Sequence, residues 1–344
     1  MTMYNFQSSP VQSSPVQSII IPTYNRKDML AEAIDSVLKQ SLKDIEVIVI
    51  DDCSADGTSE FVKSIPDERV RCIRNDKNSG QEASRMYGLR LARGKYITFL
   101  DDDDYYTDYE FFEKAVKIHE EHEGLTMVYA NADIVNTLTH ETRRWDIGTP
   151  GRANGVDDFI LGKYRKAPST FPAVCRADIL RLAGFEDKIV FDGLLYIEAS
   201  LYGDLWVMPD IIGVYRIHGE SAEQGYKDKN PDREARHWRI VREATRRWQY
   251  VRKEIRARKD KKTADDLFVS RVSGLFYYFG KARPGFPDRV RALRCILGES
   301  GFMPKLWLKL IFRKLKSILR KITPLRKIYR FIKYRLRGRP YPED

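Results

Sequence analysis

The sequence predicts an α/β fold, in which a Rossmann-like sheet is covered by helices and a basic, helical C-terminal extension follows. Three observations lead to this prediction. Short apolar segments alternate four times with segments whose apolar residues recur at helical spacing. Each apolar segment ends in polar or acidic residues, as strands do that carry a ligand site at their carboxyl ends. After residue 225 the chain becomes heavily charged and helix-forming.

The alternating segments can be assigned in order. A strand, a helix and the next strand imply right-handed crossovers and parallel pairing, with both faces of the sheet covered. The predicted strands are 18–21, 45–50, 70–74 and 96–100, and the predicted helices lie around 30–38, 58–65, 80–92 and 111–118. Residues 126–220 predict shorter, mixed elements, including a strand at 127–131 and a helix from Ala177.

Composition narrows the class of protein. Of 344 residues, 42 % are hydrophobic, which is enough for a sizeable core. The net charge of +11 belongs to the end of the chain: residues 301–344 hold 14 Lys and Arg and two acids, so the preceding 300 residues carry about −1. There is no signal-like N-terminus, no apolar run near the roughly 18 residues of a membrane span, and no CxxC pair. A cytoplasmic protein is expected.

Polar groups follow the first, second and fourth predicted strands, at Thr23-Tyr24-Asn25, Asp51-Asp52 and Asp101–Asp104. In a parallel sheet these ends meet at one edge. Four consecutive aspartates repel one another, and a hard cation such as Mg²⁺ or Mn²⁺ relieves that repulsion while binding phosphate oxygens. A solvated acidic turn is the alternative.

Other phosphate-binding motifs are missing from the sequence. No GxGxxG follows the first strand. The segment from Gly88 to Gly94-Lys95-Tyr96 has one residue too many between its glycines for a Walker A loop, and it lacks the Ser or Thr. Dehydrogenase and P-loop functions are therefore excluded, and a metal is the expected holder of the phosphates.

Four segments of the chain resemble the family 2 inverting glycosyltransferases. They are IIIPTYNR (19–26), IVIDDCSADGT (48–58), NDKNSG with SRMYGL (75–89) and ARGKYITFLDDDD (92–104). The resemblance covers residues 18–104 and implies a GT-A fold with a mixed sheet. It also implies a nucleotide-diphosphate sugar donor, with a UDP-sugar as first choice, and Mg²⁺ or Mn²⁺ as cofactor.

The resemblance implies roles for single residues. Thr23 and Tyr24 would lie against the base, Tyr24 by stacking, and Asp52 would hydrogen-bond the base with support from Asp51. Arg85 would face the phosphates, unless it is a surface charge on its helix. The donor site is thus predicted to consist of Pro22, Thr23, Tyr24, Asn25, Asp51, Asp52, Arg85, Asp101 and Asp102.

The run FLDDDD aligns with the Asp-x-Asp motif of the family. Asp103 would bind the metal, Asp101 or Asp102 would touch the ribose or donor sugar, and Asp104 would only start the next turn. Downstream, residues 213–221 resemble the family's Tyr-Arg-x-His…Ser segment. His218 is therefore predicted as a metal ligand, with a structural histidine as the alternative, and Arg216 as a phosphate contact.

An inverting transfer needs one carboxylate to take the acceptor's proton. In the family this base is the Asp of a Glu-Asp motif, and counting back from Gly203 places Asp192 there. Phe191 replaces the glutamate, and Gly193 replaces the usual aromatic residue. Glu198 and Asp187 remain alternatives.

Changes of composition along the chain set the domain boundaries. The predicted parts are a flexible arm (1–17), a GT-A domain (18–225) with a nucleotide-binding half (18–125) and an acceptor half (126–225), and a helical region (226–344) that ends in a basic amphipathic tail (301–344). Lys and Arg alternate with Leu, Ile and aromatics in this tail, which favours an anionic membrane surface over packing on the body or oligomerisation. No nucleic-acid fold accompanies the charge, so no nucleic acid is expected.

These features predict a non-processive transferase, peripheral at the inner face of the plasma membrane, that acts on a lipid-linked or cell-surface glycan. The Gln-x-x-Arg-Trp motif of processive relatives is absent, because Ala244 precedes Arg247-Trp248. The alternatives are a nucleotidyltransferase and a catalytically impaired nucleotide-sugar-binding protein. His119 and His122 are i, i+3 on a glutamate-rich helix, so a solvated helix face is predicted for them rather than a metal pair.

Overall fold

The structure is a computed structural model that describes residues 14–162, 172–187, 192–219 and 231–282. The chain divides into two compact units, Met1–Ser221 and Ala222–Asp344. Gln17, predicted to belong to the flexible arm, is the first residue of a strand. Residues 1–13 of that arm, and the whole basic tail 301–344, lie outside the described residues.

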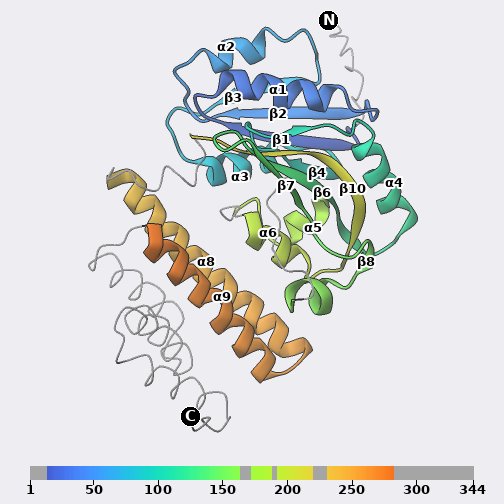
Figure 1. Ribbon diagram of the computed structural model, residues 1–344, viewed down its shortest axis with the longest axis vertical. Coiled ribbons are helices and arrows are strands. Elements are labelled where there is room, and N and C mark those ends of the chain that lie inside the picture. The colour runs from blue at the N-terminus through green and yellow to red at the C-terminus, as the bar shows by residue number, and fades with distance from the viewer. Residues whose placement is uncertain (1–13, 163–171, 188–191, 220–230, 283–344) are drawn as a thin grey trace, which may run out of the picture. The chain divides into compact units, whose positions relative to one another are not determined.

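The first unit is built on a ten-stranded mixed sheet (Figure 1). Its first four strands lie in the order β3-β2-β1-β4 and pair in parallel, as predicted. Their bounds are Gln17–Thr23 for β1, Ile45–Asp51 for β2, Val70–Arg74 for β3 and Tyr96–Phe99 for β4. Thr23 pairs with Asp51 in the register of β1 and β2, so the carboxyl ends of these strands lie next to each other.

The second half of the sheet makes it mixed. Strand β9 lies antiparallel between β4 and β6, whereas β6 and β10 are parallel. The short β5 is the last strand of this order and pairs antiparallel with β10. The bounds are Tyr105–Tyr106 for β5, Leu125–Asn136 for β6, Glu141–Trp145 for β7, Gly151–Ala153 for β8, Ala173–Arg176 for β9 and Asp204–Ile217 for β10. The β5–β10 pairing brings the end of β10 back to the loop that follows β4.

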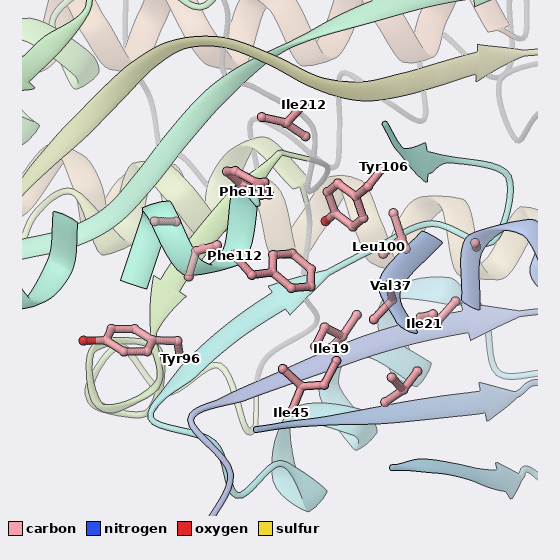
Figure 2. Close-up of a cluster of buried hydrophobic side chains, with 14 of the residues drawn as sticks. Ile19, Ile21, Val37, Ile45, Tyr96, Leu100, Tyr106, Phe111, Phe112 and Ile212 are labelled. Atoms are coloured by element: carbon pink, nitrogen blue, oxygen red, sulfur yellow. The ribbon is translucent and has the colours of Figure 1, made fainter. Parts of the chain in front are cut away.

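Helices cover both faces of the sheet. Alternate residues of β1 point to opposite faces, so Ile19 and Ile21 lie in the core with Val37 of α1 and with Phe111 and Phe112 of α4 (Figure 2). The bounds are Lys27–Leu38 for α1, Thr58–Lys63 for α2, Gln81–Leu91 for α3, Phe111–Glu121 for α4, Gly155–Ile160 for the π-helical turn η1, Ala177–Leu182 for α5 and Asp192–Ala199 for α6.

The opposite face of β1 receives α3. A Cβ on Gly88 of this helix would lie 2.4 Å from Cγ2 of Ile20, which is far inside van der Waals contact. Glycine is therefore what allows α3 to approach the strand this closely. The close packing holds the N-terminal end of α3, and with it Gln81 and Arg85, at the carboxyl edge of the sheet.

His119 of α4 and His122, the residue after this helix, do not form a solvated helix face, so that prediction is wrong. His119 is buried, stacks on Tyr96 with ring centroids 4.8 Å apart, and donates from Nε2 to the carbonyl oxygen of Val174 at 3.0 Å. His122 stacks on Trp206 with centroids 4.3 Å apart. Burial lowers the pKa of His119 to about 4. Both side chains serve packing.

The described part of the second unit is a helical hairpin of α8 (Pro231–Arg258) and α9 (Lys261–Ala282). Buried apolar side chains line both helices, and an ion pair of 2.7 Å joins Arg252 to Asp265. The predicted helical character of this region is confirmed over residues 231–282. Within the described part of the chain, none of the helices is both long and apolar enough to cross a bilayer.

Candidate donor and metal site

The carboxyl ends of β1, β2 and β4 come together at one edge, as the alternation of strands and helices predicted. The hydroxyl of Thr23 donates to Oδ2 of Asp102 at 2.8 Å, although the two residues are 79 positions apart. The backbone N–H of Asp52 donates to the carbonyl oxygen of Thr23 at 2.9 Å. Parallel pairing of β1 with both neighbours produces this convergence.

The first and last aspartates of the run are held from different sides. Oδ1 of Asp101 accepts from Nε2 of Gln81 at 2.6 Å and from the guanidinium of Arg85. Asp104 is fully buried, and its Oδ1 accepts the backbone N–H of Arg216 at 2.9 Å. Its Oδ2 is also buried and has no hydrogen-bond partner. Asp104 is therefore not merely the start of a turn, and that expectation is wrong.

The two central aspartates, Asp102 and Asp103, both pair with the guanidinium group of Arg26. Nη1 of Arg26 lies 2.7 Å from Oδ1 of Asp102 and 2.7 Å from Oδ2 of Asp103. The same Oδ2 of Asp103 lies 3.0 Å from Nε2 of His218. Arg26 is part of the segment that carried the family resemblance, but its sequence context gave no reason to assign it a role.

The electrostatics of the run show an excess of negative charge. Burial raises the pKa of Asp102 to about 7, with Asp103 adding to the shift and Arg26 opposing it. Burial and the charges of Asp103 and Asp101 hold the pKa of Asp104 well above its ordinary range. The side chains around the run thus leave its charge only partly neutralised.

A divalent cation fits this arrangement. Asp101, Asp103 and Asp104 each offer one carboxylate oxygen, and these oxygens lie within 4.8 Å of one another. The partnerless Oδ2 of Asp104 is a buried acceptor that a bound cation would satisfy. Carboxylate oxygens with one imidazole nitrogen, here from His218, are suitable ligands for Mg²⁺ or Mn²⁺.

The two aspartates after β2 are engaged in shaping loops. Asp51 is buried and accepts from Ser54 N–H at 2.8 Å, from the hydroxyl of Ser59, and from Nη1 of Arg74 at 2.9 Å. Asp52 orders the loop before α3: it accepts from Nδ2 of Asn75 and from the N–H groups of Ser79 and Gly80 at 2.7–2.8 Å. The predicted contact of Asp52 with a base stays a prediction.

The remaining donor-site residues lie around the same edge. Tyr24 leaves 42 % of its surface exposed, so its ring is available for stacking. Asn25 adopts φ 54°, and its Oδ1 accepts the N–H of Ala55 at 2.7 Å, which ties the loop after β1 to the loop after β2. Pro22, the residue before the last one of β1, is buried. The alternative for Arg85 is wrong, because its side chain is buried and not a surface charge.

The acceptor half contributes Arg216 and His218 from the end of β10. Arg216 donates from Nε to the carbonyl oxygen of Asp103, pairs with Glu32 of α1, and lies 4.9 Å from the ring centroid of Tyr105. The bond to the Asp103 carbonyl fixes the backbone of the aspartate run. The sequence predicted only a phosphate contact for Arg216, not this structural role. Glu32 and Gln81 are further residues of the site that the sequence analysis missed.

The three candidates for the base lie in different environments. Asp192 is the first residue of α6, and the preceding residues 188–191 lie outside the described part. Glu198 of the same helix is fully buried. The Asp187 carboxylate is 86 % exposed and pairs with Arg90, near the C-terminal end of α3 and hence away from the edge that holds the aspartate run. Burial encloses Glu198 in protein, and Asp187 lies at the opposite end of α3 from Gln81 and Arg85.

Comparison with known proteins agrees with this geometry. Residues 18–177 match the family model described as "Glycosyl transferase family 2". Among curated proteins, the UDP-Glc:alpha-D-GlcNAc-diphosphoundecaprenol beta-1,3-glucosyltransferase WfaP of Escherichia coli is 44 % identical over 89 residues, which are 26 % of this chain and 36 % of WfaP. The succinoglycan biosynthesis protein ExoO of Rhizobium meliloti is 43 % identical over 94 residues, which are 27 % of each chain.

These matched segments span about a third of the length of the curated relatives. Among solved structures, S. aureus TarS 1-349 in complex with UDP-GlcNAc superposes with a TM-score of 0.65 at 19 % identity, covering 95 % of this chain and 93 % of that one. The likeness is one of fold, and it confirms the predicted mixed sheet of the GT-A type.

Proposed function

Because residues 18–177 match the family model described as "Glycosyl transferase family 2", we propose that the protein transfers a sugar from a nucleotide-diphosphate sugar to a hydroxyl group of an acceptor. One observation carries the proposal: Asp101, Asp103, Asp104 and His218 meet at the carboxyl edge of the sheet, beside the loops after β1 and β2. In an α/β sheet this edge is where a nucleotide binds. A metal–diphosphate complex fits the charge gathered there.

In this proposal Mg²⁺ or Mn²⁺ is held by Asp103 and His218, with Asp101 and Asp104 offering further oxygens. When bound, the cation stabilises the negative charge that develops on the departing diphosphate. Arg216 and Glu32 keep the backbone of the aspartate run in place, and Arg85 fixes the carboxylate of Asp101. Asp101 or Asp102 then faces the ribose or donor sugar.

We assign the base to Asp192. The acceptor oxygen forms a bond to the anomeric carbon while the bond from that carbon to the diphosphate breaks, and the hydroxyl proton passes to the Asp192 carboxylate. A single displacement of this kind inverts the anomeric centre. The Asp192→Asn variant is expected to bind nucleotide as the wild type does and to lose transfer by at least about 100-fold. Retained turnover removes Asp192 from the role.

The donor of first choice is a UDP-sugar. Support comes from the fold shared with TarS, which has been solved with UDP-GlcNAc, and from WfaP, which is named for UDP-Glc. In the loops that would receive the nucleotide, Tyr24 offers an exposed ring for the base, and Asp51 and Asp52 hold the surrounding backbone. The hydroxyl of Thr23 holds the carboxylate of Asp102. Pro22 and Asn25 shape the turn beneath it.

The acceptor is proposed to be a lipid-linked or cell-surface glycan, extended by one sugar per encounter. WfaP is named for a diphosphoundecaprenol acceptor and ExoO for succinoglycan biosynthesis, which supports a polysaccharide pathway. The basic amphipathic segment 301–344 would hold the protein at the anionic inner face of the plasma membrane. Deleting 301–344 is then expected to move the protein from the membrane fraction to the soluble fraction, and an unchanged distribution rejects this part of the proposal.

The function as a whole is tested by release of nucleoside diphosphate from a panel of UDP-, GDP- and dTDP-sugars with Mn²⁺. A metal-dependent transferase is expected to release nucleoside diphosphate from one donor of the panel and to stop doing so when EDTA removes the metal ion. Tight binding without turnover of any donor, with and without candidate acceptors, would identify a nucleotide-sugar-binding protein that has lost catalysis.

A further inference from the structure

Arg26 is placed to act on the aspartate run itself. It is the residue immediately before α1, and its side chain is only 20 % exposed. Its Nη1 lies at 2.7 Å from a carboxylate oxygen of each of the two central aspartates. One cation thus bridges Asp102 and Asp103, which are consecutive in the sequence and repel each other.

The two carboxylates differ in what else holds them. Asp102 is secured on its other oxygen by the hydroxyl of Thr23 at 2.8 Å. Asp103 uses the same Oδ2 for Arg26 and for Nε2 of His218. Oδ2 is the Asp103 oxygen that faces Nε2 of His218, so a metal ion held between these two atoms would bind the oxygen that Arg26 contacts.

Like charges make this overlap costly. A guanidinium group and a divalent cation on one oxygen would lie within a few ångströms of each other, where like charges repel even in a strongly screening medium. Asp102 can keep Arg26 after the contact with Asp103 is lost, because its own contacts to Arg26 and Thr23 use separate oxygens. The arrangement thus has a place for the guanidinium both with and without a metal.

We propose that Arg26 is an intramolecular counter-cation that competes with the divalent metal ion for Asp103. In the metal-free protein it offsets part of the negative charge of the Asp102–Asp103 pair, and it releases Asp103 when a metal ion binds. Its presence therefore weakens metal binding in the absence of donor. This inference rests on the metal site of the proposed function, and it concerns only the affinity of that site.

The test is direct Mn²⁺ binding to the full chain without donor, measured from the electron paramagnetic resonance signal of free Mn²⁺. Arg26→Gln is expected to bind Mn²⁺ about tenfold more tightly than the wild type, because one unit of like charge is removed from the ligand oxygen. Arg26→Lys, which keeps the charge, is expected to stay within about threefold of the wild type. Arg26→Met removes the same charge and replaces the glutamine variant if that variant does not fold.

Lys27→Gln is the matched control, since Lys27 is adjacent in the sequence and its side chain makes no ion pair in the described part of the chain. It removes the same net charge and is expected to leave the Mn²⁺ affinity unchanged. Equal or weaker Mn²⁺ binding by Arg26→Gln overturns the proposal, and so does an equal gain in Lys27→Gln. Failure of the proposed transferase function would appear differently, as absence of nucleotide-sugar turnover in the wild type whatever the ratio of Mn²⁺ affinities.

Discussion

Nε2 of His218 lies 3.0 Å from Oδ2 of Asp103, and this contact joins residues 115 positions apart in the chain. It exists because β10 pairs with β5 directly after the aspartate run, and because the backbone N–H of Arg216 donates to Asp104. The second half of the sheet thereby brings an imidazole nitrogen to carboxylates that the first half supplies. The proposed metal site depends on both halves.

Removing either partner of this contact is expected to impair metal-dependent turnover. Asp103→Asn removes a charged ligand, so we expect the turnover rate to fall roughly 100-fold or more and the Mn²⁺ concentration needed for half-maximal rate to rise. His218→Ala should lower the turnover rate by about 10- to 100-fold, because the carboxylate ligands remain. Steady-state rates at varied Mn²⁺ concentration measure both effects. His122→Ala is the control, because that ring stacks on Trp206 away from the aspartate run; an equal loss there would show a general effect on folding.

Arg85 and Arg90, both on α3, allow a buried ion pair to be compared with an exposed one. Arg85 is buried and paired with Asp101, whereas both partners of the Arg90–Asp187 pair are largely exposed. Arg85→Met leaves the Asp101 carboxylate without its buried partner and should lower the free energy of unfolding by roughly 3–5 kcal/mol. Arg90→Met should change it by less than about 1 kcal/mol. Urea unfolding at pH 7 measures both values, and similar changes in the two variants would contradict the burial of Arg85.

His119 predicts a pH dependence of stability. Its pKa is lowered to about 4 in the folded protein from an ordinary value of 6.5, because the ring is buried. Its Nε2 donates to Val174, while Nδ1 is buried without a hydrogen-bond partner. The unfolded chain therefore takes up a proton between these two pKa values and the folded protein does not. The stabilisation is complete above pH 6.5 and is lost as the pH falls toward 4.

The pKa difference of His119 contributes roughly 3 kcal/mol to the free energy of unfolding, at 1.36 kcal/mol for each unit of pKa. Other groups also titrate in this range, so the useful quantity is the difference between the wild type and His119→Phe, which keeps the stacking on Tyr96. The variant should lose less stability than the wild type between pH 7 and pH 5 in urea unfolding. Parallel curves for the two proteins would show that His119 is accessible to protons in the folded state.

The first four strands could be predicted because their signals are local. Each is a short apolar segment bounded by turn residues, and parallel pairing of β1, β2 and β4 then follows from the intervening helices. The convergence of Thr23 and Asp102 is a consequence of that pairing. These parts of the site needed only the order of the elements along the chain.

The burial of Asp104 could not be predicted from local sequence signals. It depends on the pairing of β5 with β10, which joins residues more than 100 positions apart. The bridging position of Arg26 likewise depends on where α1 begins relative to β4. The burial of His119 had a usable signal that was overlooked: it continues the buried stripe of Phe112 and Ala115 at helical spacing. The neighbouring Glu120 and Glu121 are exposed, so they lie off the face on which His119 is buried.

The central claim is metal-dependent use of a nucleotide-sugar at the Asp103–His218 edge, and the most direct measurement is release of nucleoside diphosphate by the wild type and Asp103→Asn. With Mn²⁺, the wild type is expected to release UDP from one member of a UDP-sugar panel, and to stop when EDTA is added. Asp103→Asn should release UDP at least about 100-fold more slowly at the same Mn²⁺ concentration. Equal rates for the two proteins, or a wild-type rate that EDTA does not change, would contradict the account.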